Sequence, residues 1–249
     1  TVRMPVMTYL LIGTILAVWV LLQGAGFDQT ALAVSVCNLG MVPGELTGQA
    51  TVGTSIPLGP GMACVVDDWA LNIWTPVTSM FLHGSWGHLL GNLLFFWVFG
   101  TNIEDSMGRA RVLVFYLLCG LIAAGAHVVV DPESPVPTVG ASGAISGVLG
   151  AYLVLYPRVR VRMLFWFLLF IRIFRVPAWA VLLWWFFWQV VSGLPQLMPM
   201  RPEVSGGVAV WAHIGGFLAG VVLVRLFVDE NLHRRRLAMD DARDTFLTA

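Results

Sequence analysis

The stretch GASGAISGVLGAY, residues 140–152, decides the fold that this sequence predicts. Most of its residues are glycine, alanine or serine, although the chain around it is rich in large apolar side chains. Four small residues recur at the helical spacing i, i+3, i+4 and i+7, namely Gly143, Ser146, Gly147 and Gly150. Such a stripe lets two helix backbones approach closely within a membrane. The stretch therefore predicts a helix that begins at Ser142 and packs tightly against another helix.

The composition of the whole chain is that of an integral membrane protein. Of its 249 residues, 58 % are hydrophobic and 11 % are charged, whereas a typical soluble domain has about 25 % charged residues. The net charge of zero argues against a nucleic-acid partner, because such a partner requires a basic surface. The three cysteines form no close pair and predict no zinc site. We expect neither a metal nor a cofactor.

Six stretches are apolar enough to cross a bilayer, which takes about 20 residues each. They are residues 5–22, 83–103, 112–130, 142–156, 176–194 and 207–228. We therefore expect an all-α membrane protein, a six-transmembrane-helix bundle with a long outer loop between its first two helices. Residues 1–228 form one membrane domain, and residues 229–249 form a charged cytoplasmic tail with no chemistry of its own.

Arginines decide the expected orientation, since the chain contains no lysine. With six spans, every arginine except Arg201 falls on one side, which the positive-inside rule makes cytoplasmic. Both termini are then cytoplasmic, and we expect a multi-pass protein of a bacterial inner membrane. The apolar run 163–171, bracketed by five arginines, is too short to cross. We predict that it lies in the membrane interface while its arginines reach water.

The outer loop, residues 23–82, has no basic residue but several acidic ones, and it is too long for a simple connector. Cys37 and Cys64 both lie in it and would face an oxidising compartment. A disulfide between them and two unpaired thiols are equally open interpretations.

Uncommon polar residues open three of the predicted spans. His88 and Asn92 lie four residues apart in the second span, Ser142 opens the fourth, and His213 lies early in the sixth. Polar groups inside spans are costly and mark function by default. Because these three spans run from outside to inside, the four residues lie within about 10 Å of the outer ends of their helices.

Small residues indicate which of these groups meet. Gly216 and Gly220 form a second small stripe in the sixth span, close to His213. If this stripe faces the one at 143–150, Ser142 and His213 come within hydrogen-bonding reach. Ordinary helix packing explains either stripe alone, but it does not explain why each stripe adjoins a polar residue at the same depth.

A serine paired with a histidine is an activated nucleophile. No acidic residue lies at this depth, so we expect a dyad without a carboxylate. The backbone N–H groups at the start of the helix, including that of Ser142, can stabilise an oxyanion together with the His88 and Asn92 side chains. The predicted reaction is peptide hydrolysis.

These motifs resemble those of the rhomboid intramembrane serine proteases. GASG at 140–143 matches the family's GxSG, which makes Ser142 the counterpart of the nucleophile. AHIGG at 212–216 matches the segment that holds the catalytic histidine, here His213. His88 and Asn92 match the family's HxxxN, which implies oxyanion-hole roles. Further residues are expected to shape the site: His83, Gly140, Gly143, Ser146 and Gly216.

The resemblance also implies a substrate, a gate and a cap. The substrate would be another transmembrane protein in the bilayer, cleaved near the outer face. The aromatic fifth span resembles the lateral gate, although rings that simply face lipid explain it as well. The loop 195–206 resembles the cap that lifts to admit substrate. In one departure, Ser146 stands where the family often has an aromatic residue against the catalytic histidine, so what orients His213 is left open.

Three other functions are alternatives to this interpretation. A non-catalytic rhomboid relative that binds membrane helices is the main alternative, but such relatives usually lack the serine or the histidine, and both are present here. A zinc site built from His83, His88 and His213 leaves Ser142 unused. A channel or transporter requires polar residues through the full membrane depth, whereas the inner halves of these spans are almost wholly apolar.

Overall fold

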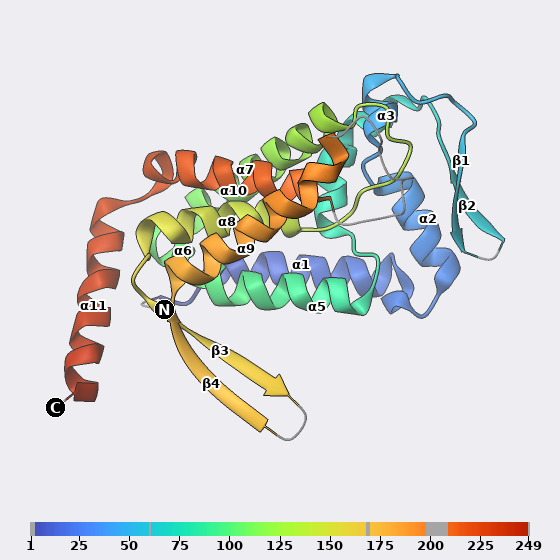
Figure 1. Ribbon diagram of the computed structural model, residues 1–249. Helices are drawn as coiled ribbons and strands as arrows, with labels where there is room; N and C mark the ends of the chain where they lie inside the picture. Colours follow the sequence, from blue (N-terminus) through green and yellow to red (C-terminus); the bar gives the residue numbers. More distant parts are fainter. Residues whose placement is uncertain (1–2, 60, 168–169, 198–208, 249) are drawn as a thin grey trace.

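The computed structural model describes residues 3–59, 61–167, 170–197 and 209–248, most of which are helical (Figure 1). Residues 198–208, with Arg201 and most of the predicted cap loop, lie outside the described residues. Each predicted span corresponds to a helix. These are α1 (Val6–Leu21), α5 (Trp86–Phe95) with α6 (Thr101–Met107), α7 (Arg109–Val130), α8 (Ser142–Leu155), α9 (Ala178–Gly193) and α10 (Val210–Phe227). α5 continues into α6 through a π-helical turn, Phe96–Gly100.

Within the described residues, three helices are long and apolar enough to cross a membrane by length and composition, namely Arg109–Val130, Ala178–Leu197 and Val210–Phe227. α1 and α8 are apolar but shorter, with 16 and 14 residues. α8 lies at the centre of the packing, because all of its residues from Gly143 to Tyr152 are buried. α7 and α10 pack on it through small residues: a Cβ atom built on Gly147 would overlap the Cys119 side chain of α7, and one built on Gly150 would overlap the backbone of Phe217 in α10.

The prediction of an all-α protein was too narrow, because two antiparallel hairpins are present. β1 (Ser55–Gly59) pairs with β2 (Met62–Val65), and β3 (Arg160–Phe167) pairs with β4 (Phe170–Pro177). The second hairpin contains the apolar run 163–171. That run is rich in aromatic and branched side chains, which favour strands, and a short apolar run cannot be assigned to helix or strand by its periodicity alone.

The predicted outer loop is folded. It contains α2 (Gln29–Leu39), α3 (Pro43–Thr47), the first hairpin and α4 (Thr75–Thr78). The 3₁₀ turns are Gly24–Gly26, Ala70–Trp74 and Ser79–Phe81, with a fourth, Leu194–Leu197, after α9. A disulfide joins Cys37 of α2 to Cys64 of β2, which resolves the open question of these thiols. α2, α3, β1 and β2 gather at one end of the helix bundle (Figure 1).

The opposite end of the bundle carries the N-terminus, the second hairpin and α11 (Glu230–Thr248) (Figure 1). There the Glu104 carboxylate accepts hydrogen bonds from the backbone of Met7 and Thr8 and from the Thr8 hydroxyl. A carboxylate at this position favours α1, because it satisfies free N–H groups at the helix N-terminus and complements its dipole.

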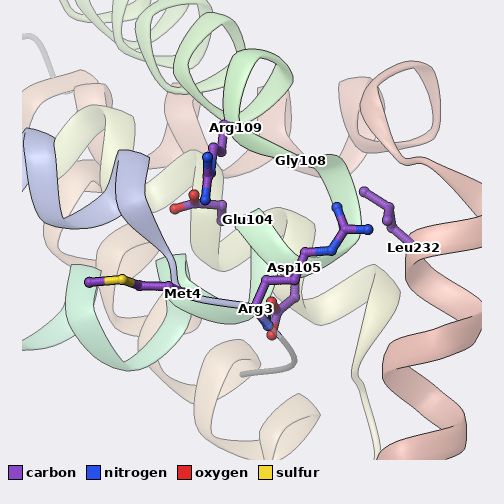
Figure 2. A pocket seen from close by; sticks show the side chains of 7 residues that line it. All are labelled: Arg3, Met4, Glu104, Asp105, Gly108, Arg109 and Leu232. Carbon is purple, nitrogen blue, oxygen red and sulfur yellow. Dashed lines mark hydrogen bonds between the residues drawn. The ribbon is translucent and has the colours of Figure 1, made fainter.

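The first turns of α11 contact the bundle. His233 Nδ1 lies 3.0 Å from Ser106 Oγ, and Arg236 forms an ion pair with Asp105 at 3.6 Å. Burial lowers the pKa of His233, while the charge of Glu230 partly opposes this effect. A pocket of about 410 Å³ lies at the same end. Figure 2 shows its lining side chains, which come from the segment before α1, from the α6–α7 junction and from α11, and none is a predicted site residue.

Candidate catalytic site

Ser142 and His213 are joined by a hydrogen bond. Ser142 is the first residue of α8, and its Oγ lies 2.7 Å from Nε2 of His213, which is in the first turns of α10. His213 is buried, with 8 % of its surface exposed. The two residues are 71 positions apart in the chain, so only the packing of α8 on α10 brings them together.

Glycines make that packing possible. A Cβ atom built on Gly216 would overlap the carbonyl oxygen of Gly143, and one built on Gly220 would overlap that of Gly147. A Cβ on Gly150 would likewise overlap the carbonyl oxygen of Phe217. The small stripes of α8 and α10 therefore face each other with their backbones in contact, as the sequence predicts.

Gln189 of α9 holds the other side of the His213 ring. Its Oε1 lies 2.8 Å from His213 Nδ1. An amide oxygen only accepts hydrogen bonds, so this contact is satisfied when Nδ1 carries the proton. Nε2 then has a free lone pair directed at the Ser142 hydroxyl. The three side chains thus form a chain of hydrogen bonds in one tautomer of the histidine.

Sequence reasoning missed Gln189. Ionisable groups are the ones that stand out inside a membrane span, and Gln189 is a neutral amide in an aromatic-rich span. A usable signal was present, because Gln189 lies near the C-terminal end of its predicted span and Ser142 and His213 near the N-terminal ends of theirs. Since the fifth span is expected to run opposite to the fourth and sixth, all three residues are expected at a similar depth. The Trp185 ring, one turn away on α9, lies 5.9 Å from the His213 ring. Two residues of α9, Gln189 and Trp185, therefore lie against the His213 ring.

The hydroxyl of Ser146 bonds to the backbone of its own helix. Its side chain is buried, and its hydroxyl donates to the Ser142 carbonyl at 2.6 Å, one turn earlier in α8. A small residue with an internally satisfied hydroxyl suits the crowded interface between α8 and its neighbours. The geometry indicates a packing position.

His88 lies against the loop that precedes Ser142. A Cβ built on Gly140 would come within 2.7 Å of His88 Cε1 and Nε2, and within 3.6 Å of Ser142 Oγ. Gly140 also has φ +133°, a conformation that side chains with a Cβ rarely adopt. Gly140 therefore leaves room for the imidazole of His88 beside the Ser142 hydroxyl.

Asn92 and His83 form a second group behind His88. Asn92 Nδ2 lies 2.9 Å from His83 Nε2, and the rings of His83 and His88 meet edge to face at 5.0 Å. The backbone of His83 exchanges two hydrogen bonds with the Gln23 side chain, at 2.8 and 2.9 Å. His83 is thus fixed and in turn holds Asn92. The second N–H of the Asn92 amide is not needed for this contact.

The arrangement has the parts that acyl transfer requires. A hydroxyl contacts a histidine, the histidine contacts an orienting acceptor, and the first N–H groups of α8 have no acceptor within their own helix. Across the described ranges, no three His, Cys, Asp or Glu side chains are grouped so that they could hold a metal ion. The zinc alternative is therefore not supported by these residues.

Comparisons with known proteins point to one family. Residues 70–230 match the family model described as Rhomboid domain. Rhomboid protease GluP of Bacillus subtilis is 42 % identical over 80 residues, which are 32 % of this chain and 15 % of GluP. Rhomboid-like protein 11, chloroplastic, of Arabidopsis thaliana is 29 % identical over 155 residues, 60 % of this chain and 51 % of that protein.

Rhomboid protein 1, mitochondrial, of Saccharomyces cerevisiae is 29 % identical over 153 residues, which are 59 % of this chain and 39 % of the yeast protein. The matches to these three relatives thus cover from 15 % to 51 % of the relatives' own lengths.

Proposed function

The chain belongs to the rhomboid family, whose domain covers residues 70–230 of its 249, and on this premise we propose that it is an intramembrane serine endopeptidase. It hydrolyses a peptide bond in or near a transmembrane helix of a membrane-protein substrate. Ser142 is the nucleophile and His213 is the general base. The observation that carries the proposal is the 2.7 Å contact between Ser142 Oγ and His213 Nε2.

The first chemical step forms an acyl-enzyme. Ser142 Oγ attacks the scissile carbonyl carbon while His213 Nε2 takes the hydroxyl proton. The same proton then passes from His213 to the leaving amine, and the peptide bond breaks. In the second step His213 takes a proton from a water molecule, and the hydroxide so formed attacks the acyl carbon. His213 then returns the proton to Ser142 Oγ as the ester bond breaks, so that the acid product leaves and the hydroxyl is restored. Gln189 keeps the proton on Nδ1 throughout, so that Nε2 serves as the base in both steps.

The negative oxygen of the tetrahedral intermediate needs hydrogen-bond donors. The N–H groups at the start of α8, that of Ser142 included, supply some of them, and the His88 ring beside Gly140 supplies another. The Asn92 amide donates its remaining N–H to the same oxygen once substrate is bound, while its contact with His83 holds the amide in place. Gly140, Gly143 and Gly216 shape the site by letting these groups approach.

The proposed topology has six crossings, formed by α1, the continuous helix 86–107, α7, α8, α9 and α10, within a membrane domain of residues 1–228. The shortness of α8 supports an active site inside the membrane. Its 14 residues extend about 21 Å, which is about 9 Å less than the hydrocarbon thickness. Ser142 at its N-terminus then lies below the membrane surface.

The proposed orientation has both termini and the charged tail in the cytoplasm and the site open to the outer face, as the arginines of the sequence favour. A bacterial inner membrane fits this orientation. Substrate enters beside α9. This helix is the least enclosed of the three long spans, with 17 % of its apolar window buried against 50 % for α10.

Active-site labelling tests the proposal. The purified chain is treated with a fluorophosphonate, or is given a transmembrane substrate with small residues near the end of its helix, and the products are identified by mass. We expect the probe to modify Ser142 and the substrate to be cut within or next to its membrane segment. If the chain neither labels at Ser142 nor cuts any such substrate, the non-catalytic alternative holds.

The role of Gln189 gives a second prediction. Methionine at this position has a similar length but no strong acceptor, so Gln189→Met is expected to lower kcat on the order of 10²-fold, within the range of general-base contributions, with little change in KM. Gln189→Glu keeps an acceptor oxygen, so its kcat is expected to stay close to that of the native chain, unlike the kcat of Gln189→Met. Val190→Met, on the same helix, controls for the added methionine. An unchanged kcat in Gln189→Met contradicts an orienting role.

A further inference from the structure

The β3–β4 hairpin is an arm that the proposed reaction does not use. Its strands pair from Arg160 with Pro177 to Phe167 with Phe170. It leaves the bundle between α8 and α9, at the end where the N-terminus and α11 also lie, and it extends away from the helices (Figure 1). In this view the strands slant back along the length of the bundle rather than beyond its end.

Most of the charge of the arm lies near its root, at Arg160, Arg162 and Arg175, whereas Arg172 lies farther out, opposite Phe165. The register places Arg162 opposite Arg175 near the root, and it places Leu164 opposite Ile173 farther out. Leu164 and Ile173 are 67 % and 65 % exposed, and Met163 and Phe174, which pair on the other face, are also exposed. The arm therefore presents apolar side chains on both faces beyond a basic root.

The arginines require a source of negative charge outside the arm. Like charges directly opposite each other destabilise a hairpin, and residues 157–178 contain no aspartate or glutamate. Among the residues that the structure describes, none of the hairpin arginines forms an ion pair with a carboxylate. An anion at the root would relieve the repulsion between Arg162 and Arg175.

The membrane interface supplies both an anion for the arginines and an apolar environment for the exposed side chains. A lone two-stranded hairpin is marginally stable in water, and apolar side chains exposed on both of its faces favour a second, apolar environment. The hairpin cannot lie within the hydrocarbon core, because the outer edge of each strand has unpaired backbone groups that need water or headgroups as hydrogen-bond partners. The apolar helix that is long enough to cross a membrane starts at Ala178, directly after the last residue of β4. The root of the hairpin, where its strands join the bundle, therefore lies where the membrane begins.

We propose that the β3–β4 hairpin is a binding arm for anionic phospholipids. The exposed side chains of Met163, Leu164, Ile173 and Phe174 enter the boundary between headgroups and acyl chains. Arg160, Arg162 and Arg175 bind lipid phosphates at the root. Arg172 lies farther out, opposite Phe165, and its long side chain reaches a headgroup phosphate from there. The arm holds the α8–α9 connection against the membrane surface, and this role is independent of the protease activity.

Spin labels on the full chain in lipid nanodiscs test the proposal. Labels at Leu164→Cys and Ile173→Cys, in a Cys119→Ala background, report contact with oxygen, which partitions into lipid, and with a nickel chelate, which stays in water. A label at Leu237→Cys on α11 serves as the control. The bilayers contain phosphatidylcholine alone or mixed with phosphatidylglycerol, and Arg162→Gln/Arg175→Gln is compared with the native arm.

We expect phosphatidylglycerol to protect the two hairpin labels from the nickel chelate, and each arginine lost to weaken this association about fivefold. The control label is expected to stay accessible. Thermal unfolding confirms that each variant is folded. The proposal is overturned if the hairpin labels stay in water in both bilayers. It is also overturned if they are protected equally without anionic lipid or without the arginines.

Discussion

Alanine at position 142 is expected to lower kcat for cleavage of a transmembrane substrate by at least about 10⁴-fold. The substitution removes the attacking oxygen but leaves His213, Gln189 and the α8 N-terminus in place, so substrate binding and KM are expected to change little. The oxygen atom is small and half-buried, and its loss opens no large cavity. Rates measured with a purified substrate, together with thermal unfolding of the variant, separate lost chemistry from lost structure.

A neighbouring serine provides the control for Ser142→Ala. Ser146 lies one turn along α8, and its hydroxyl bonds to the helix backbone rather than to His213. Ser146→Ala is therefore expected to keep a readily measured rate. Loss of activity in Ser146→Ala without loss in Ser142→Ala would exchange their roles and contradict the proposed mechanism.

The double variant tests whether the serine and the histidine act as one unit. Residues that act together in a single step have strongly non-additive effects. His213→Ala alone is expected to cost about as much as Ser142→Ala, and the variant with both substitutions is expected to be no worse than either. If the two losses multiply instead, His213 contributes separately from the serine, and the 2.7 Å contact is not the catalytic one.

The sequence carries most of the information about where the helices form and about which of them bring Ser142 and His213 together. Apolar length predicts where helices form, and small residues at helical spacing predict which faces approach closely. The stripes of α8 and α10 follow from Gly143, Gly147, Gly216 and Gly220 in this way. Because backbone contact fixes how two helices are rotated against each other, the same glycines determine where Ser142 points.

Other features depend on geometry that a single sequence does not encode locally. Gln189 reaches His213 only through the rotation of α9, and the aromatic residues of this helix show no periodic face. Whether two cysteines bond depends on the positions of their Cα and Cβ atoms, which here come from α2 and β2. The docking of His233 on Ser106 joins residues 127 positions apart, and no motif marks it.

Alanine at Gly220 is expected to destabilise the protein by about 3 kcal/mol, the upper part of the usual range for overpacking. The added Cβ would overlap the carbonyl oxygen of Gly147. A backbone atom cannot relieve the overlap by changing rotamer, as a flexible side chain can. The helices α8 and α10 must therefore move apart. Gly220 is almost two turns from His213, and the change therefore alters helix packing without replacing a group of the site. Unfolding of the purified protein in mixed micelles measures the loss.

Gly13→Ala and Gly125→Ala are the matched controls, because a Cβ at either position meets nothing within 4 Å. Alanine favours a helix over glycine by up to about 1 kcal/mol, so these variants are expected to be as stable as the native chain or slightly more stable. Gly220→Ala with equal stability would mean that α8 and α10 do not pack through their backbones. In that case the close approach that carries Ser142 to His213 would need another cause.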